Sequence, residues 1–173
     1  MKIELLRYPT DEDWMRCKML ALNTVGKEAA AQPSLTWKKK ILAAEHSPIR
    51  TLMFTIKMEI PYWVSVHYVR HKYGVEHFVR SQRTDRTGEN RDEKRQDEMV
   101  THIMDINAQE LMFMARRRLC NLASKETREV MEEITKQVNE VCPEFAQVLE
   151  PMCERNGGVC YEMQSCGKVK IKI

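Results

Sequence analysis

Apolar side chains occupy every second position between residues 51 and 60. They are Leu52, Phe54, Ile56, Met58 and Ile60. Alternation with this period places them on one face of an extended chain, which is typical of a strand with one buried side. A weaker alternation from Lys2 to Tyr8 predicts another strand ahead of Pro9. We therefore expect two strands here, the second of them ended by Pro61.

Apolar residues spaced by three and four positions predict helices elsewhere. These helices are expected with Asp11 as N-cap, from near Ser34, after Pro61 as far as residue 72, over residues 107–121, from the cap Ser124 to Val141, and in a short form from Pro143. In the helix after Pro61, Trp63, Val66 and Arg70 would fall on one side.

The remaining segments read as loops. Residues 83–99 are polar, contain glycine and are densely charged, which predicts a loop or lid. The cysteine-containing tail, about residues 150–173, is irregular before a candidate last strand. We predict one α+β domain over residues 1–173, with a mostly antiparallel central sheet flanked by helices.

Charge and composition limit the functional classes. The chain has 28 Lys and Arg against 25 Asp and Glu, a net charge of only +3. This balance argues against a general nucleic-acid coat, so positive charge matters by location. The amino terminus lacks a secretory pattern, and no run of about 18 apolar residues occurs. We expect a soluble, cytoplasmic protein that is not bound to membranes.

Residues 68–91 concentrate basic side chains directly after an apolar, aromatic element. They include Arg70, His71, Lys72, His77, Arg80, Arg83, Arg86 and Arg91, together with Ser81 and Gln82. Guanidinium forks, imidazoles and a hydroxyl at this density suit bidentate recognition of phosphate and of a flat polar ring. An anionic, planar ligand is therefore the first hypothesis.

Three blocks of sequence resemble one enzyme family. The first is Arg70-His71-Lys72 followed by Ser81 and Arg83; the second is Glu45-His46-Ser47-Pro48 before Phe54-Thr55-Ile56; the third is Asn107-Ala108-Gln109 with Arg117 and Arg118 downstream. In order and spacing they resemble the motifs of the flavin-dependent thymidylate synthases. Lys72 and Gln109 stand where that family usually has arginine, and Ser81 lies one residue later than its usual spacer.

The resemblance implies a reaction and its components. Reduced FAD would pass a one-carbon unit from methylenetetrahydrofolate to C5 of dUMP and then supply the hydride, with NADPH reducing the flavin. The flavin carries the difficult chemistry, so no cysteine nucleophile is needed. The chain is short for so many ligands. The resemblance therefore also implies a homotetramer whose active sites are shared between subunits.

The resemblance also assigns roles to residues. Arg118 would stabilise negative charge developing on the uracil carbonyls, and Ser81 would act with it at the catalytic centre. The candidate substrate-binding residues are Arg70, Ser81, Gln82, Arg83, Arg118, His67 and Arg91. The candidate cofactor-binding residues are His71, Lys72, Asn107, Gln109, His46 and Ser47.

Other interpretations stay open. Arg118 could be an ion-paired surface residue, and His46 a structural histidine. The methionines Met99, Met104, Met112 and Met114 are best explained as core packing.

Two alternative functions also stay open. A different flavin-dependent modification of a pyrimidine nucleotide would use the same scaffold. A nucleic-acid-binding module built on residues 70–95 is a further alternative, and it predicts affinity that falls steeply with salt.

Four cysteines lie near the carboxyl terminus. They are Cys142, Cys153, Cys160 and Cys166. Four thiolates could hold a structural zinc ion, although their spacing is wider than in a two-residue knuckle. Free buried thiols and disulfides are the alternatives.

Overall fold

The computed structural model describes residues 1–170, whose centre is an antiparallel sheet. Its strands are β1 (Lys2–Arg7), β2 (Met53–Pro61), β3 (Val75–Val79) and β4 (Met99–Asn107), in the spatial order β1-β2-β4-β3. The predicted α+β class with an antiparallel sheet is confirmed. β2 begins two residues later than predicted because Ser47–Thr51 form a 3-10 turn.

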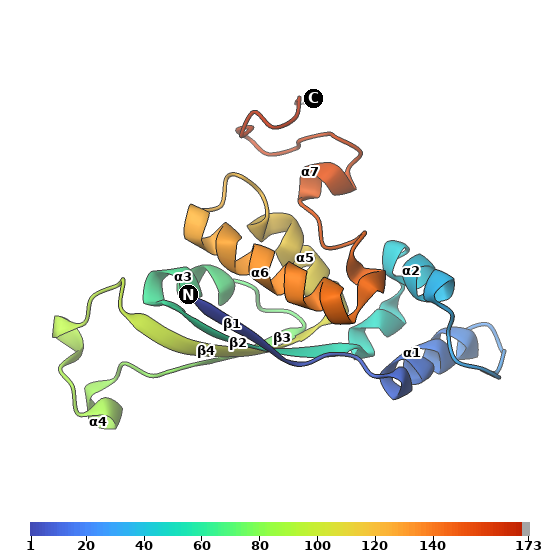
Figure 1. Ribbon diagram of the computed structural model, residues 1–173, viewed down its shortest axis with the longest axis horizontal. Coiled ribbons are helices and arrows are strands. Elements are labelled where there is room, and N and C mark those ends of the chain that lie inside the picture. Colours follow the sequence, from blue (N-terminus) through green and yellow to red (C-terminus); the bar gives the residue numbers. More distant parts are fainter. Residues whose placement is uncertain (171–173) are drawn as a thin grey trace.

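The helices cover one side of the sheet and extend beyond one of its ends (Figure 1). They are α1 (Asp11–Asn23), α2 (Leu35–Ala43), α3 (Tyr62–Tyr68), α4 (Thr84–Thr87), α5 (Ala108–Arg118), α6 (Lys125–Val141) and α7 (Met152–Arg155). In Figure 1, α3, α5 and α6 lie on one side of the sheet, while α1 and α2 lie beyond its end. The alternating residues of β2 and β4 supply the core, since Phe54, Met58 and Met104 are fully buried.

Several local predictions are confirmed and others are wrong. Ser34 and Ser124 cap α2 and α6 as expected. The cap of α1 is Thr10 rather than Asp11, because the Thr10 hydroxyl and the Asp13 carboxylate form a reciprocal capping box. Helix α3 ends at Tyr68, so Arg70 lies beyond it and not on its face.

Strands β3 and β4 were not predicted. β4 contains Met99 and Met104, which were treated only as packing residues; Met104 is buried, but Met99 is half exposed, so the core prediction is wrong there. β3 is short and lies at the sheet edge, with Phe78 59% exposed. A five-residue edge strand without a fully buried face gives little periodic signal.

A side chain from α6 ties the other edge strand to the helical layer. The Leu5 N–H donates to Gln137 Oε1 at 3.0 Å, and Gln137 Nε2 donates to the Ile3 carbonyl at 3.0 Å. Two backbone groups of β1 are thereby paired with a helix side chain. This contact fixes α6 across the sheet and protects the edge from pairing with another strand.

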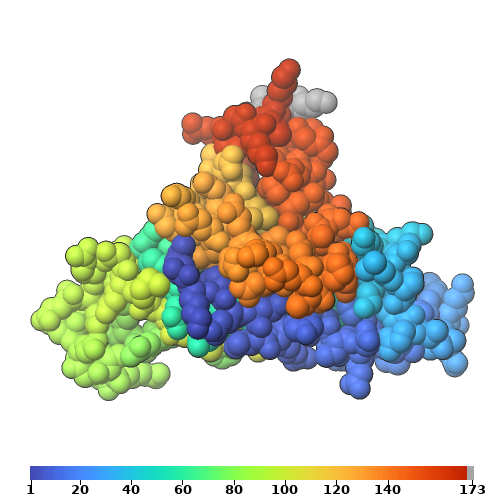
Figure 2. Space-filling view, in the orientation of Figure 1, coloured from blue at the N-terminus to red at the C-terminus, as the bar shows by residue number. Residues whose placement is uncertain are grey.

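Three parts project from the body in Figure 2: the segment around residues 80–98, the region of α1 and α2, and the carboxyl-terminal tail. The first is the predicted loop, which is folded around α4 and a 3-10 turn at Arg91–Glu93. Residues 156–170 form no regular strand, and the end of the candidate last strand lies outside the described residues. Among residues 1–170, no helix has the length and apolarity needed to cross a membrane.

Candidate active site

The predicted site residues fall into two groups within one chain. His67, Arg70, His71, Asn107, Gln109 and Arg118 gather where the turn after α3 meets β4 and α5. Ser81, Gln82, Arg83 and Arg91 gather beyond the far end of β3. β3 alone separates the two ends by about 13 Å. A single chain therefore presents two part-sites at opposite ends of one strand.

His71 is the centre of the first group and is 6% exposed. Its Nδ1 lies 2.7 Å from Glu110 Oε1, and Arg118 Nε donates to its Nε2 at 3.1 Å. A guanidinium can only donate, so Nε2 must hold a lone pair and Nδ1 the proton. The contacts thus assign a neutral imidazole between a carboxylate and a guanidinium.

Arg118 is anchored from two directions. Besides its bond to His71, its Nη2 donates to the His67 carbonyl at 2.5 Å. Burial lowers the pKa of Arg118, and the nearby positive charges of Arg70 and Arg117 act in the same direction. The open interpretation of Arg118 as a surface ion pair is not what the contacts show, since its partners are an imidazole and a carbonyl.

His67 and Arg70 lie beside this guanidinium. Burial lowers the pKa of His67, with further contributions from the charges of Arg118 and Arg70. The His67 ring faces the helical layer, because its Nδ1 is 3.0 Å from Thr127 Oγ1 on α6. Arg70 is exposed at the start of the turn, where its fork is accessible to a ligand.

A groove of about 470 Å³ opens beside His71 over the start of α5. It is lined by Glu45, Arg50, Tyr73, Gly74, Asn107, Gln109, Glu110, Phe113 and Arg116. Asn107 caps α5 by accepting the Glu110 N–H at 2.9 Å, and its own N–H donates to the Gly74 carbonyl at 2.8 Å. Arg50 Nε donates to Gln109 Oε1 across the groove.

Gly74 fits where no other residue would. Its φ is +73°, and an added Cβ would lie 2.3 Å from Asn107 Nδ2. The turn after α3 therefore approaches the cap of α5 more closely than any side chain would allow.

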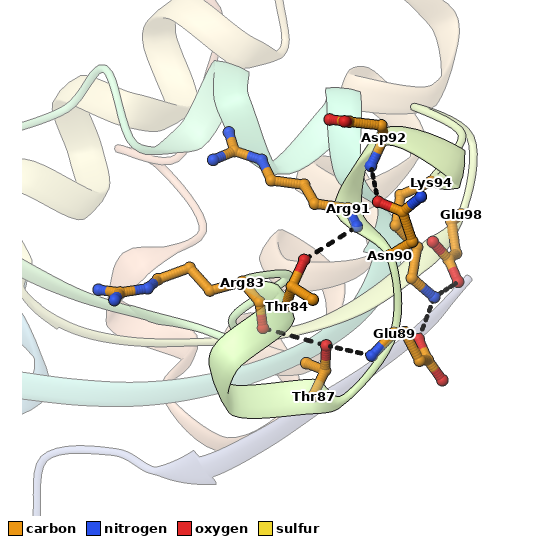
Figure 3. Close-up of polar contacts among 9 residues, drawn as sticks. All are labelled: Arg83, Thr84, Thr87, Glu89, Asn90, Arg91, Asp92, Lys94 and Glu98. Carbon is orange, nitrogen blue, oxygen red and sulfur yellow. Dashed lines mark hydrogen bonds and ion pairs between the residues drawn. The ribbon is translucent and has the colours of Figure 1, made fainter.

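Ser81, the centre of the second group, is half-buried in a smaller cleft of about 240 Å³. It is lined by Tyr62, Val79, Arg80, Ser81, Gln82, Arg83 and Arg91. Ser81 Oγ accepts the Arg83 N–H at 3.2 Å, and Arg83 forms a two-pronged pair with Asp85 at 2.9 and 2.8 Å. In Figure 3 the side chains of Arg83 and Arg91 extend in the same direction, away from the loop.

The loop that carries Arg91 is held by its own polar contacts, drawn in Figure 3. Lys94 pairs with both Glu89 and Glu98, and the Arg91 N–H donates to Thr84 Oγ1 at 3.2 Å. Thr87 Oγ1 donates to the Arg83 carbonyl and accepts the Glu89 N–H. These bonds make the predicted lid a folded unit.

Other predicted residues lie outside both hollows. Lys72, His46 and Ser47 are exposed and do not line the groove described above.

The zinc prediction for Cys142, Cys153, Cys160 and Cys166 is wrong. Within residues 1–170, no group of three or more His, Cys, Asp or Glu side chains lies close enough together to hold a metal ion. All four are free thiols. Cys142 is buried at the end of α6, which raises its pKa to about 12, while the others lie in the tail.

Sequence reasoning assigned no role to Glu110 or Arg50, and it named His77 only among the basic side chains, without its partner His102. Glu110 follows the cap Asn107 by three residues, a spacing that could have placed it in the first turn of α5. The two histidines become partners only when β3 pairs with β4.

Comparison with known families addresses this region of the chain. Residues 96–144 match the family model Thy1, described as thymidylate synthase complementing protein. The match covers less than a third of the chain and shows a likeness to that family in this segment. It spans β4, α5 and α6, and so contains Asn107, Glu110 and Arg118. No curated protein matches the chain significantly.

Proposed function

We propose that this chain is a flavin-dependent thymidylate synthase, which converts dUMP to dTMP with methylenetetrahydrofolate as the one-carbon donor and NADPH as the reductant. The observation that carries the proposal is the His71–Glu110–Arg118 cluster, two of whose members lie in the segment that matches the Thy1 family model. Resemblance in the Arg70-His71-Lys72 block adds support from outside that segment.

The groove beside His71 suits part of a flavin dinucleotide. Tyr73, 86% exposed, offers a flat ring for stacking, while Asn107, Gln109 and Arg50 provide amide and guanidinium groups. Ligand sites commonly measure about 300–1,000 Å³, so this groove has room for one end of the dinucleotide. Bound here and reduced by NADPH, the flavin would relay the one-carbon unit and supply the hydride.

Arg118 is the proposed electrophilic residue. Two of its nitrogens are engaged by His71 and His67, which fixes the guanidinium while other N–H groups stay free to donate to a uracil carbonyl. Because the group is half-buried, a charge developing on that oxygen would be stabilised more strongly than in water.

The cleft around Ser81 is the proposed phosphate site. The Ser81 hydroxyl can donate a hydrogen bond to a phosphate oxygen, and Arg83 and Arg91 add two positively charged guanidinium groups to the same cleft. A nucleotide phosphate would replace Asp85 as the partner of Arg83, whose pair with Asp85 is exposed and therefore weak.

Separation of the two groups favours a shared site. Arg118 and Ser81 lie at opposite ends of β3 in one chain, so one nucleotide would meet both more readily if they came from different subunits. We therefore propose a homotetramer in which the Ser81 cleft of one subunit faces the Arg118 cluster of another.

Two measurements test the proposed function. Purified protein should bind FAD, seen as a visible flavin absorption band, and should release the C5 hydrogen of dUMP and form dTMP when methylenetetrahydrofolate and NADPH are present. Analysis of the nucleotide product separates this reaction from another flavin-dependent pyrimidine modification. A protein that binds no flavin and leaves dUMP unchanged would contradict the proposal.

A further inference from the structure

A pair of hydrogen-bonded histidines lies directly behind His71. His77 on β3 and His102 on β4 are joined by a bond of 2.9 Å between His77 Nδ1 and His102 Nε2. The second nitrogen of His77, Nε2, lies 2.9 Å from the backbone carbonyl of His71. His102 is fully buried, and its Nδ1 has no hydrogen-bond partner in the described part of the chain.

These contacts assign a tautomer to each ring. A carbonyl oxygen only accepts, so His77 Nε2 must carry a proton. In neutral His77, Nδ1 then holds the lone pair, and His102 Nε2 must donate to it. The direction of donation runs from His102 through His77 to the His71 carbonyl.

We propose that His77 is a positioning residue for His71, and that His102 selects the His77 tautomer that can perform this role. The positioning of His71 is inferred from these contacts alone, and only its importance for catalysis rests on the proposed function. His71 would be held at its backbone by His77, and at its ring by Glu110 and Arg118. Three contacts from two different elements would then fix the imidazole to which Arg118 donates.

Burial supports neutral rings in this pair. The pKa of His102 is lowered to about 4 by burial, and a charge on His77 would lower it further. Burial also lowers the pKa of His77, against the opposing effects of its bond to the His71 carbonyl and the charges of Glu76 and Glu110. Charge on His71 would lower the pKa of His77 further.

Two polar substitutions separate positioning from general stability. His77→Gln can place an amide N–H near the position of Nε2 and keep the bond to the His71 carbonyl. His77→Asn reaches only as far as Nδ1, so it keeps the contact with His102 and loses the contact with His71. Phe78→Thr, on the other face of β3, is the matched control, because Phe78 is exposed.

The first readout is the ¹⁵N spectrum of the His71 ring in the protein without flavin. Wild type, His77→Gln and Phe78→Thr should show one neutral tautomer with the proton on Nδ1, while His77→Asn should show a mixture. The second readout is FAD affinity, which His77→Asn should weaken about tenfold, the loss expected for one hydrogen bond. His77→Gln should restore the affinity.

Unchanged His71 signals in His77→Asn, or an equal loss in His77→Gln, would overturn the proposal. If His77→Asn does not fold, His102→Phe provides a second test, because it removes the donor to His77 and should produce the same mixture of His71 tautomers. A wild-type His71 spectrum in His102→Phe would also overturn the proposal. Failure of wild type to bind FAD would overturn the proposed function instead, and the ring spectrum would still decide the role of His77.

Discussion

At the scale of single residues, the orientation of His71 is set by two hydrogen-bonding groups: a guanidinium that can only donate and a carboxylate that accepts. Glu110 accepts from one His71 nitrogen and Arg118 donates to the other, so the imidazole is neutral and fixed in orientation. The same contacts hold Arg118 in place. A residue predicted as an electrophile is thus oriented by a carboxylate that was not predicted.

Replacing Arg118 with lysine should lower kcat about 100-fold. Lysine keeps the charge but cannot bond to His71 and His67 while also reaching a substrate carbonyl. Initial rates of dTMP formation at saturating FAD would measure this, with circular dichroism to confirm folding. Arg117→Lys is the control, because Arg117 pairs with Glu162 near the surface and should retain activity. A kcat near wild type in Arg118→Lys would argue against the electrophilic role.

His102 should make the fold sensitive to acid. Its folded pKa of about 4 lies below the ordinary value of 6.5, so the unfolded chain takes up a proton first as pH falls. Stability from this residue is fully present above pH 6.5 and is lost as pH falls towards 4, by up to about 3 kcal/mol. Urea unfolding of wild type and His102→Asn at pH 7 and pH 4.5 measures the effect. An equal loss of stability in both proteins would contradict it.

At the scale of elements, the site depends on one close approach between a turn and a helix cap. Gly74 lies against Asn107, and Asn107 begins α5, the helix that carries both Glu110 and Arg118. The blocks recognised in the sequence around residues 70 and 107 are therefore joined in space by a glycine that neither block includes.

Gly74→Ala should destabilise the protein by about 2 kcal/mol or more, because the new methyl group would clash with Asn107 and the residue would have to keep a positive φ. Gly26→Ala is a matched control, since Gly26 has a φ of +66° and open space around an added Cβ. The free energy of unfolding of each variant measures the difference. Equal losses would show that backbone strain alone, rather than the clash, determines the cost.

The predictability of the elements followed their burial pattern. β2 and α6 have clear apolar periods and were predicted nearly to their ends, and the starts of α1 and α2 were predicted to within about a residue. β4 has an equally regular pattern, but His102 replaces an apolar residue and the charged loop precedes it. β3 is short and lies exposed at the sheet edge, so its sequence has no clear apolar period. Its pairing with β4 stabilises it as a strand.

At the scale of the whole molecule, the proposed sharing of sites between subunits can be tested by combining two inactive variants. A Ser81→Ala chain and an Arg118→Ala chain should each be inactive alone. Mixed in one tetramer with shared sites, they should recover up to about a quarter of wild-type activity, because random pairing leaves some sites with both intact residues. Activity after co-refolding tests this, and solution mass reports the assembly. Mixtures as inactive as the single variants would argue against sharing.

The amino-acid sequence by itself determined the antiparallel α+β class, most helices, and the identity of the blocks around His71, Asn107 and Arg118, since these depend on local periodicity and short motifs. Tertiary structure decided which of those residues meet. Strand pairing brought His77 to His102 and the turn after α3 to the cap of α5, and it separated Ser81 from Arg118. Such contacts join residues far apart in the chain, and only folding specifies their hydrogen-bond partners.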